Sequence, residues 1–336
     1  MRGLIAWGCR VIRMAESTIG THNGAFHCDE VTACFMLKQL EPYKSARILR
    51  TRDPAVLGTC TLVVDVGDVY DPNTLRFDHH QAAFQDTLGG NFTNVRLSSA
   101  GLIYKHYGRE VLQQLSGIQE EKTLEWLYTM MYRNLIEMID ANDNGIAQYK
   151  VDTPPLYHDS TSLPSRVGRL NAAWHESVPD EDVTRFHAAM DLVGEEFRSQ
   201  LRGLTDNLLP AKAIVEEAYH SRKTEVASGT VLVLARSCPW KEFLYEVEKL
   251  DPQEPRVYFA VYSDGRNWRI QDVGLEGVRF GNRKGLPAAW RGKRGEELAQ
   301  VSGVADAIFA HNTGFIGGAA SKAGVLRMAE LALAEP

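Results

Sequence analysis

The 336-residue sequence lacks several features that define large classes of protein. It has no uncharged apolar run of about 18 residues or more, so no segment has the length and hydropathy of a membrane-spanning helix. Its five cysteines, at positions 9, 28, 34, 60 and 238, are scattered and include no Cys-x-x-Cys pair. This pattern indicates neither a disulfide framework nor a structural zinc site, and it favours a reducing compartment.

The chain also lacks an excess of positive charge, because its formal net charge is -6 at pH 7. Nucleic-acid binding usually shows as overall basicity or as one concentrated basic face, so any such contact must come from a local cluster. An apolar content of 44% and a charged content of 24% are ordinary for a globular protein. The length allows two domains, each with its own core.

Residues 1–16 form a distinct basic segment. It carries Arg2, Arg10 and Arg13 and has no acid before Glu16. Two interpretations fit equally: an organelle-targeting presequence, or a ragged N-terminus of the same composition. Met14 offers a second start that would omit the basic residues, so one message could yield two cellular forms.

Three strands are predicted in the first part of the chain, at 18–21, 46–51 and 61–66. A helical pattern from Val31 to Leu40 separates the first two, with Asp29 where a helix cap is expected. Strands separated by a helix suggest a parallel sheet, whose ligand crevice lies beyond the carboxyl ends of the strands. We therefore expect an α/β domain over residues 17–165, ending in the Pro-containing stretch 151–165.

The most informative stretch is Phe77-Asp78-His79-His80-Gln81. An acid followed by two imidazoles is a good ligand set for a divalent ion at neutral pH. Similar residues follow other predicted elements, which favours a shared metal site: His22, His27, Asp29, Asp65 and Asp140. We expect Asp68 and Asp143 to orient ligating imidazoles. Glu30 is interpreted as an ordinary surface or packing residue.

The last third of the chain has a different pattern. Strands are predicted at 231–235, 257–262 and 268–273, and a hairpin turn joins the last two. A final strand at 307–310 is followed by a glycine-rich stretch, His311 to Gly318, and a helix from Ser321. Such a loop before a helix N-terminus is typical of a phosphate cradle. We assign residues 166–336 to a helical connection and a smaller α/β (α+β) substrate-binding domain.

A basic stretch from Arg279 to Arg294 holds six basic residues and no acid, with Phe280 and Trp290 interleaved. A charge run is usually only a solvated face. In a chain of negative net charge, however, this mixture suits phosphate contacts and base stacking, and it favours contact with nucleic acid. The predicted substrate-binding residues are His311, Gly317, Gly318, Arg279, Arg283, Lys284 and Arg291.

As an ordered set, the motifs resemble those of the melanocyte proliferating gene family. They are Thr-His-Asn-Gly-x-Phe-His-x-Asp-Glu, Val-Val-Asp-Val-Gly, Phe-Asp-His-His-Gln, Ile-Asp-Ala-x-Asp-Asn-Gly and His-x-x-Gly-Phe-Ile-Gly-Gly. That family is similar to the wider Asp-His-His (DHH) phosphoesterases. The resemblance implies a two-lobed, DHH-phosphoesterase-like α/β hydrolase that acts as a 3′ to 5′ RNA exonuclease in mitochondria and nucleus.

The resemblance also implies a ligand set. One ion would be held by His22, His27 and Asp65, and the other by Asp29, Asp65, His79 and Asp140, with Asp65 bridging. Asp78 would orient a ligand or the bridging water, and His80 would face the scissile phosphate. His27 stands where the wider superfamily usually has an Asp, which favours two Mn²⁺ ions over Mg²⁺.

The expected chemistry is hydrolysis of a phosphodiester in single-stranded RNA, by in-line attack of a water activated between two ions. His80 would donate a hydrogen bond or proton on the phosphate side. One alternative is the same chemistry on pyrophosphate or short oligonucleotides. A second is a metal-stabilised RNA-binding protein without turnover. No membrane partner is expected, and a homo-oligomer is compatible with the sequence.

Overall fold

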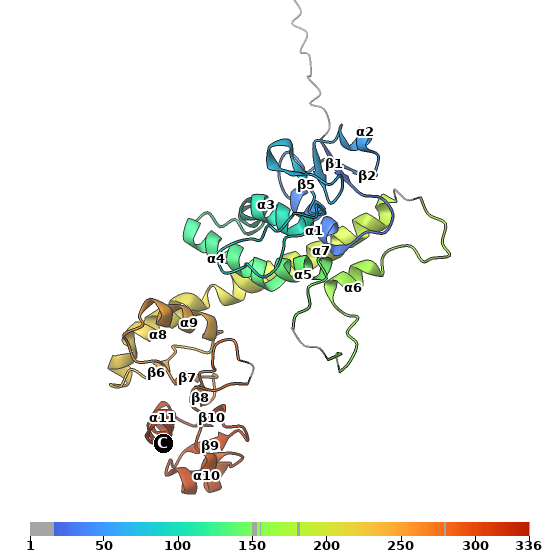
Figure 1. The fold of residues 1–336 in the computed structure, drawn as a ribbon. Helices are drawn as coiled ribbons and strands as arrows, with labels where there is room; N and C mark the ends of the chain where they lie inside the picture. The colour runs from blue at the N-terminus through green and yellow to red at the C-terminus, as the bar shows by residue number, and fades with distance from the viewer. Residues whose placement is uncertain (1–16, 150–152, 155, 180–181, 279, 336) are drawn as a thin grey trace, which may run out of the picture. The chain divides into compact units, whose positions relative to one another are not determined.

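The computed structural model describes residues 17–149, 153–154, 156–179, 182–278 and 280–335 (Figure 1). The expected targeting segment 1–16 and Arg279 lie outside these residues. The chain divides into two compact units, Met1–Leu204 and Thr205–Pro336. No helix within the described ranges is both long and apolar enough to cross a membrane.

The first unit contains a five-stranded sheet in the order β2-β1-β3-β5-β4. Strands β2, β1, β3 and β5 are parallel to their neighbours, and β4 is antiparallel to β5. Their bounds are β1 Thr18–Thr21, β2 Arg47–Arg50, β3 Leu62–Val64, β4 Tyr70–Asp71 and β5 Arg76–Phe77. All three residues of β3 are buried, as expected for a strand with neighbours on both sides and helices over the sheet.

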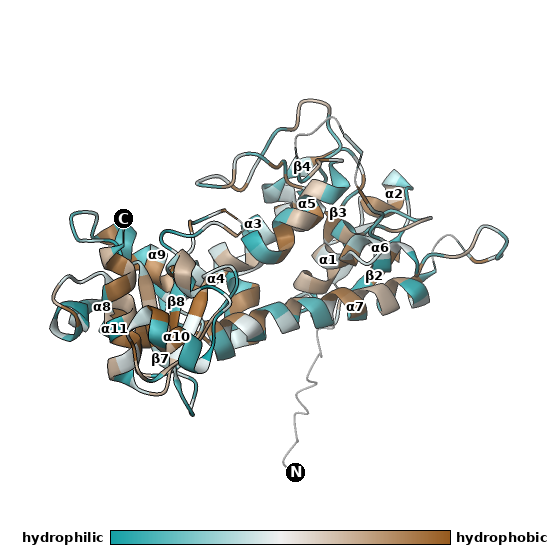
Figure 2. Ribbon diagram, turned by 90° about the horizontal axis from the view of Figure 1, so that it is seen from below, coloured by the Kyte–Doolittle hydropathy of each residue, from teal (hydrophilic) through white to brown (hydrophobic). Residues whose placement is uncertain are grey.

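Helices cover this sheet and extend the unit. They are α1 Cys28–Leu37, α2 Pro54–Leu57, α3 Ser99–Ser116, α4 Glu121–Met131, α5 Glu137–Asp143, α6 Leu163–Gly168 and α7 Val183–Arg202, with a 3-10 turn at Pro72–Thr74 and a π-helical turn at Tyr132–Ile136. Every residue of α1 is buried, and α1 packs against α3 and α7. Helix α7 alternates hydrophobic and hydrophilic residues along its length (Figure 2). Its apolar side, from Phe186 to Leu201, is buried, as the helical period requires.

The second unit contains another five-stranded sheet, in the order β6-β7-β8-β10-β9. Only the β6–β7 pair is parallel. Its elements are β6 Val231–Val233, β7 Phe259–Ser263, β8 Trp268–Asp272, β9 Ala307–Ala310, β10 Ile316–Ala319, α8 Ala211–Glu225, α9 Lys241–Leu250, α10 Gly295–Ser302 and α11 Lys322–Ala334, with a π-helical turn at Gly203–Leu208 and a 3-10 turn at Ala288–Trp290. Its core is formed by one side of the sheet with α10 and α11.

The α/β class expected from the sequence is confirmed, and several predicted elements are found with little change. The strand at 18–21 is β1, and the predicted hairpin is β7–β8, whose turn contains Gly265 at φ 93°. The expected cap at Asp29 is corrected: His27 is the N-cap of α1, and Asp29 lies in its first turn. The helical pattern 120–139 is interrupted by the π-helical turn at Tyr132–Ile136.

The boundary between the units also differs from the expected one at residue 165. It falls at residues 204/205, so α6 and α7 belong to the first unit. The physical reason is packing: α7 lies against α1, and α6 packs on both α1 and α7. The Pro-containing stretch 151–165 therefore lies within the first unit and not at its end.

Candidate metal centre

Three segments of the site follow three adjacent parallel strands. His22 comes directly after β1, Asp65 directly after β3, and Asp78, His79 and His80 directly after β5. Because β1, β3 and β5 are neighbours in the sheet, their carboxyl ends meet at one edge. The polar groups are therefore brought together by strand order, although up to 58 residues separate them in sequence (80 minus 22).

Asp65 is placed by an unusual backbone conformation. Its φ is 58°, in the left-handed region, which Asp adopts more readily than most residues. Its backbone N–H still donates to the carbonyl of Phe77 at 3.1 Å, so the sheet holds it while the chain turns away. The Asp65 carboxylate is 3% exposed.

The loop from His22 to His27 and the first turn of α1 form a second part of the site. His22 Nε2 lies 3.0 Å from Glu30 Oε1 and 3.4 Å from Asp65 Oδ2. Glu30 also accepts a hydrogen bond of 2.8 Å from the backbone N–H of His27, the N-cap residue. Glu30 is fully buried, so it is not a surface residue, and its place beside His22 and Asp65 goes beyond the packing role expected from the sequence. Glu30 lies three residues after the N-cap His27, and this capping-box spacing could have indicated from the sequence that its side chain turns back to the start of the helix.

Potential ligand atoms gather in three groups, within each of which all atoms lie within 4.8 Å of one another. Asp65 belongs to two of these groups, and His27 also belongs to two, so the groups form one continuous cluster. They are His22, His27, Glu30 and Asp65; Asp65, Asp78, His79 and His80; and His27, Asp29 and Asp143.

The cluster concentrates buried negative charge. Burial, reinforced by neighbouring carboxylates, raises the pKa of Asp29 and Asp65 above its ordinary value. Burial alone would lower the pKa of His22, but the hydrogen bonds with Asp65 and Glu30 raise it to about 10. Both effects arise because several acids share a space of low dielectric constant, where a cation is favoured.

Unsatisfied polar atoms point to the same conclusion. Asp29 Oδ1, Asp65 Oδ1 and His79 Nδ1 are buried without a hydrogen-bond partner among the described residues. His79 Nδ1 lies 3.4 Å from Asp65 Oδ1, and His79 Nε2 lies 2.8 Å from Asp143 Oδ2. Unpaired buried polar atoms are costly, and imidazole nitrogen with carboxylate oxygen suits Mn²⁺ and related divalent ions. The residues present therefore fit a divalent metal centre.

Asp78 and His80 form a pair at the rim of the cluster. The buried Asp78 carboxylate accepts hydrogen bonds from Asp68 N at 2.7 Å and from His80 N at 3.1 Å, and it lies 2.6 Å from His80 Nδ1. This last contact raises the pKa of His80 to about 9, while the His80 side chain stays 54% exposed. A protonated imidazole is thus held beside the site. Asp68 takes part through its backbone, and its side chain is exposed.

Asp140 and Asp143 have different surroundings, although the sequence suggested Asp140 as a ligand and Asp143 as a residue that orients one. Asp140 Oδ1 accepts hydrogen bonds from Ser98 N, Ser98 Oγ and Gly101 N at 2.7 to 3.0 Å, and Oδ2 accepts one from Tyr132. Burial raises the pKa of Asp140 to about 7, and these hydrogen bonds oppose the shift. Asp140 thus holds the start of α3, whereas Asp143, three residues further on, joins His27 and Asp29.

Most of the predicted substrate-binding cations of the second unit are engaged elsewhere. Arg283 makes two hydrogen bonds to Glu248, at 2.8 and 2.7 Å, in a nearly buried ion pair. Lys284 donates to the carbonyl of Glu335, and Arg291 Nε donates to that of Leu286. Trp290 is 4% exposed and belongs to the core, so it is not available for base stacking, whereas Phe280 is 92% exposed.

The predicted phosphate cradle is also corrected. Gly317 and Gly318 lie in strand β10 and not in a loop, and a Cβ on Gly318 would stand 2.8 Å from the carbonyl of Trp268. The start of α11 is occupied by Asp306, which accepts hydrogen bonds from Ser321 N and Oγ. Close strand packing explains these glycines. His311 is exposed beside them, with Nδ1 accepting from Thr313 N.

A mainly parallel sheet with a histidine and carboxylate cluster at its carboxyl edge is typical of metal-dependent hydrolases. The model of the MYG1_exonuc family, described as an uncharacterised protein family (UPF0160), matches residues 18–333. The chain therefore belongs to the MYG1 exonuclease family.

Individual relatives cover nearly the whole chain. The human "MYG1 exonuclease" is 46% identical over 330 residues, which are 96% of this chain and 87% of that protein. The "MYG1 protein" of Dictyostelium discoideum is 42% identical over 94% of this chain and 96% of its own length. Among solved structures, Thermus thermophilus RecJ in complex with Mn²⁺ has a TM-score of 0.25 and 13% identity, covering 95% of this chain and 52% of RecJ.

Proposed function

We propose that the protein is a 3′ to 5′ exoribonuclease that shortens single-stranded RNA and depends on a divalent metal. The observation that carries this proposal is the continuous ligand cluster at the ends of β1, β3 and β5, in which Asp65 is shared between two groups. The human relative is named as an exonuclease, which supports the reaction class. The RNA substrate, the direction of cutting and the mitochondrial and nuclear sites are predictions from family resemblance.

The ligand groups suggest two neighbouring metal sites. His22, His27, Glu30 and Asp65 would hold one ion, and Asp29, Asp143, His79 and Asp65 would hold a second, as the groups and the His79 contact suggest. A bound divalent ion, Mn²⁺ or Mg²⁺, supplies Lewis acidity: it withdraws charge from a phosphate oxygen and lowers the pKa of a coordinated water. A bound cation would balance the negative charge of the buried acids and favour their deprotonated form.

His80 has the position and charge for a role toward substrate. Its imidazole is half exposed beside the cluster, and the Asp78 carboxylate, 2.6 Å from Nδ1, favours its protonated form. It would donate a hydrogen bond from Nε2 to a phosphate oxygen, because Nδ1 is directed to Asp78. Asp78 is then the residue that orients and charges His80.

The test is a digest of 5′-labelled single-stranded RNA with Mn²⁺, comparing wild type with Asp78→Ala and with the exposed control Glu110→Ala. We expect a ladder that shortens from the 3′ end, in wild type and control only, and that a chelator abolishes. Removal of single nucleotides from the 5′ end, or internal fragments, would contradict the proposed direction. Intact RNA in the presence of bound Mn²⁺ would overturn the proposal.

A second candidate is hydrolysis of short oligonucleotides or pyrophosphate. One observation favours it: Arg283, Lys284 and Arg291 are engaged within the protein, which shortens the basic track that long RNA would need. A salt titration separates the two, because affinity for long RNA falls steeply with salt and affinity for a small diphosphate falls little.

A further inference from the structure

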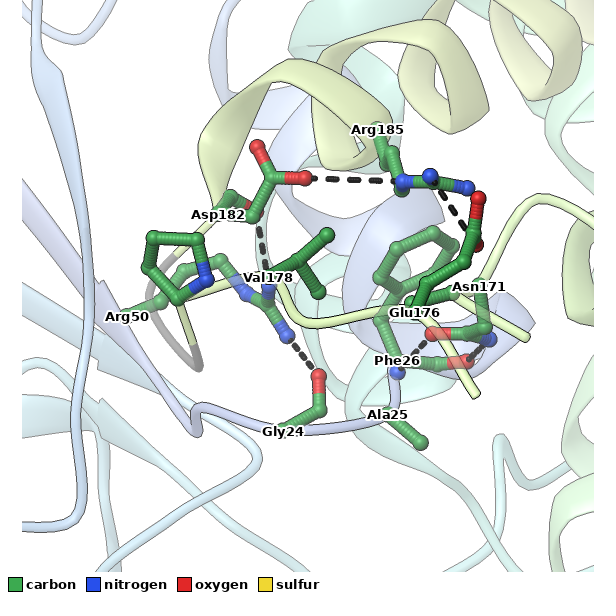
Figure 3. Close-up of a pocket in the computed structure, with 11 residues that line it drawn as sticks. Gly24, Ala25, Phe26, Arg50, Asn171, Glu176, Val178, Asp182 and Arg185 are labelled. Atoms are coloured by element: carbon green, nitrogen blue, oxygen red, sulfur yellow. Dashed lines mark hydrogen bonds and ion pairs between the residues drawn. The ribbon is translucent and has the colours of Figure 1, made fainter. Parts of the chain in front are cut away.

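A cavity of about 230 Å³ lies beside the loop that carries His22 and His27. Figure 3 shows its lining: Gly24, Ala25 and Phe26 of the loop face Arg50 of β2, Asn171 and Val178 from the chain after α6, and Asp182 and Arg185 at the start of α7. The loop that presents two candidate ligands is therefore one wall of the cavity. We call residues 22–27 the ligand loop.

Arg50 joins the ligand loop to the start of α7. Its guanidinium donates through Nη2 to the carbonyl of Gly24 and through Nη1 to the carbonyl of Asp182 at 2.8 Å. The same group lies 5.4 Å from the ring centre of Phe26 and 5.1 Å from that of Phe186. Arg50 is 4% exposed, so these contacts operate at low dielectric constant, where they are strong.

Asn171 holds the next part of the ligand loop at two points. Its Oδ1 accepts a hydrogen bond from Phe26 N at 2.8 Å, and its Nδ2 donates to Phe26 O at 2.8 Å. The Phe26 ring packs edge-on against Phe186. Both backbone groups of the residue directly before His27 are thus fixed by one side chain.

These contacts act on Gly24 and Phe26, which lie between His22 and His27 in sequence. Gly24 has a φ of 83° and no atom within 4 Å of its Cβ position, so packing alone does not fix this turn. We infer that Arg50 and Asn171 are positioning residues that set the spacing of His22 and His27 for metal binding. This inference rests on the proposed metal centre.

The alternative use of this cavity, as a ligand pocket, is disfavoured by its polar contacts. Asn171 uses both side-chain atoms on Phe26, and Arg50 contacts two carbonyl groups. Arg185 on the same wall lies 3.1 Å from Glu176 and 3.7 Å from Asp182. Because these contacts engage most of the charged and amide groups of the lining, the cavity is better suited to hold the loop than to bind a charged ligand.

The experiment measures Mn²⁺ affinity of the full-length protein by the electron paramagnetic resonance signal of free Mn²⁺. We expect Asn171→Ala to weaken affinity about tenfold or more, the scale found when groups that orient metal ligands are removed. Arg50→Lys should weaken it as well, since a single ammonium nitrogen does not reproduce the two separated donor nitrogens with which the guanidinium reaches the Gly24 and Asp182 carbonyls. Arg185→Ala is the matched control: it lines the same cavity but makes no contact with the ligand loop, and its affinity should equal that of wild type.

A purely structural role is separated by a second control. Leu201→Ala removes buried apolar contacts near the far end of α7 and should lower the melting temperature without changing Mn²⁺ affinity. If Asn171→Ala and Arg50→Lys both lower the melting temperature but bind Mn²⁺ as wild type does, the inference is overturned. If wild type itself binds no Mn²⁺, the metal centre fails, and with it the inference.

Discussion

Glu30 shows how the site opposes the stability of the metal-free protein. It is fully buried, lies 3.0 Å from His22 Nε2, and its charge adds to the raised pKa of Asp29 and Asp65. Several acids crowded in this way repel one another unless a cation balances them. Such a cost is expected where binding and not stability has shaped the residue choice.

We therefore expect Glu30→Gln to weaken Mn²⁺ affinity by about tenfold or more, while the melting temperature of the metal-free protein stays the same or rises. The reason is that one negative charge leaves the cluster and its shape is kept. Thermal unfolding with and without Mn²⁺ measures both effects. Glu110→Gln, on the exposed side of α3, is the control. An unchanged Mn²⁺ response in Glu30→Gln would remove Glu30 from the ligand set.

The buried carboxyl group of Asp272 should make the stability of the second unit depend on pH. It is 3% exposed, its Oδ2 has no hydrogen-bond partner among the described residues, and burial raises its pKa from 3.8 to about 6. Between these values the unfolded chain loses the proton while the folded protein keeps it. The free energy of unfolding should therefore fall as pH rises from about 4 to about 6, and stay lower above that range.

Asp272→Asn should remove this dependence. At pH 4 the variant and wild type should unfold alike, and at pH 7.5 the variant should be more stable by on the order of 2 kcal/mol. Urea unfolding followed by tryptophan fluorescence measures the difference, because Trp240, Trp268 and Trp290 lie in the second unit. Equal stabilities at pH 7.5 would show that Asp272 finds a partner in solution.

At the scale of elements, the start of α3 connects two carboxylates. Asp140 accepts hydrogen bonds from Ser98 and Gly101. Ser99, which follows Ser98, donates a hydrogen bond through Oγ to Asp29 at 2.7 Å. A Cβ on Gly101 would lie 2.3 Å from Asp140 Oδ2. The close approach of α3 and α5 thus depends on that glycine.

Gly101→Ala should destabilise the protein by about 1 to 3 kcal/mol, the usual cost of overpacking, and should also weaken Mn²⁺ affinity through the shifted Ser99–Asp29 contact. Gly168→Ala in α6 is the matched control: no atom lies within 4 Å of its Cβ position, so it should be neutral or slightly stabilising. Urea unfolding and Mn²⁺ titration measure the two effects. Identical behaviour of the two variants would contradict this role of Gly101.

At the scale of the whole molecule, every ligand group lies in the first unit. The second unit has its own hydrophobic core, so the two units have separate sources of stability. We expect a fragment of residues 17–204 to fold and to bind Mn²⁺ within a few-fold of the full-length affinity. RNA affinity should fall, because the proposed substrate residues such as His311 are missing.

Isothermal titration of the fragment with Mn²⁺, beside the full chain and an Asp65→Asn fragment, tests this expectation. A folded fragment without Mn²⁺ binding would mean that the second unit contributes to the centre. Undiminished RNA affinity would instead place RNA recognition in the first unit.

Much of the first unit and of its candidate metal site could be predicted, because the sequence patterns that indicate them are local. Strand β1 has the predicted bounds, and the polar clusters follow β1, β3 and β5, so a rule about parallel sheets brings them together. The same reasoning did not separate Asp140 from Asp143. Both lie near the end of one helix, and only the contacts with Ser98 and Gly101 show which carboxylate is already satisfied.

The sequence by itself determined the α/β class and most of the histidines and acids of the candidate metal site, because hydrophobic periodicity, element ends and residue types can be identified from the sequence alone. Only the tertiary structure decided the roles of Glu30, Asp143, Arg283 and Gly318. Those roles depend on burial and on partners far away in sequence: Glu248 pairs with Arg283, and the Trp268 carbonyl crowds Gly318. The sequence alone does not show whether a charged side chain or a glycine contacts a ligand or another part of the protein.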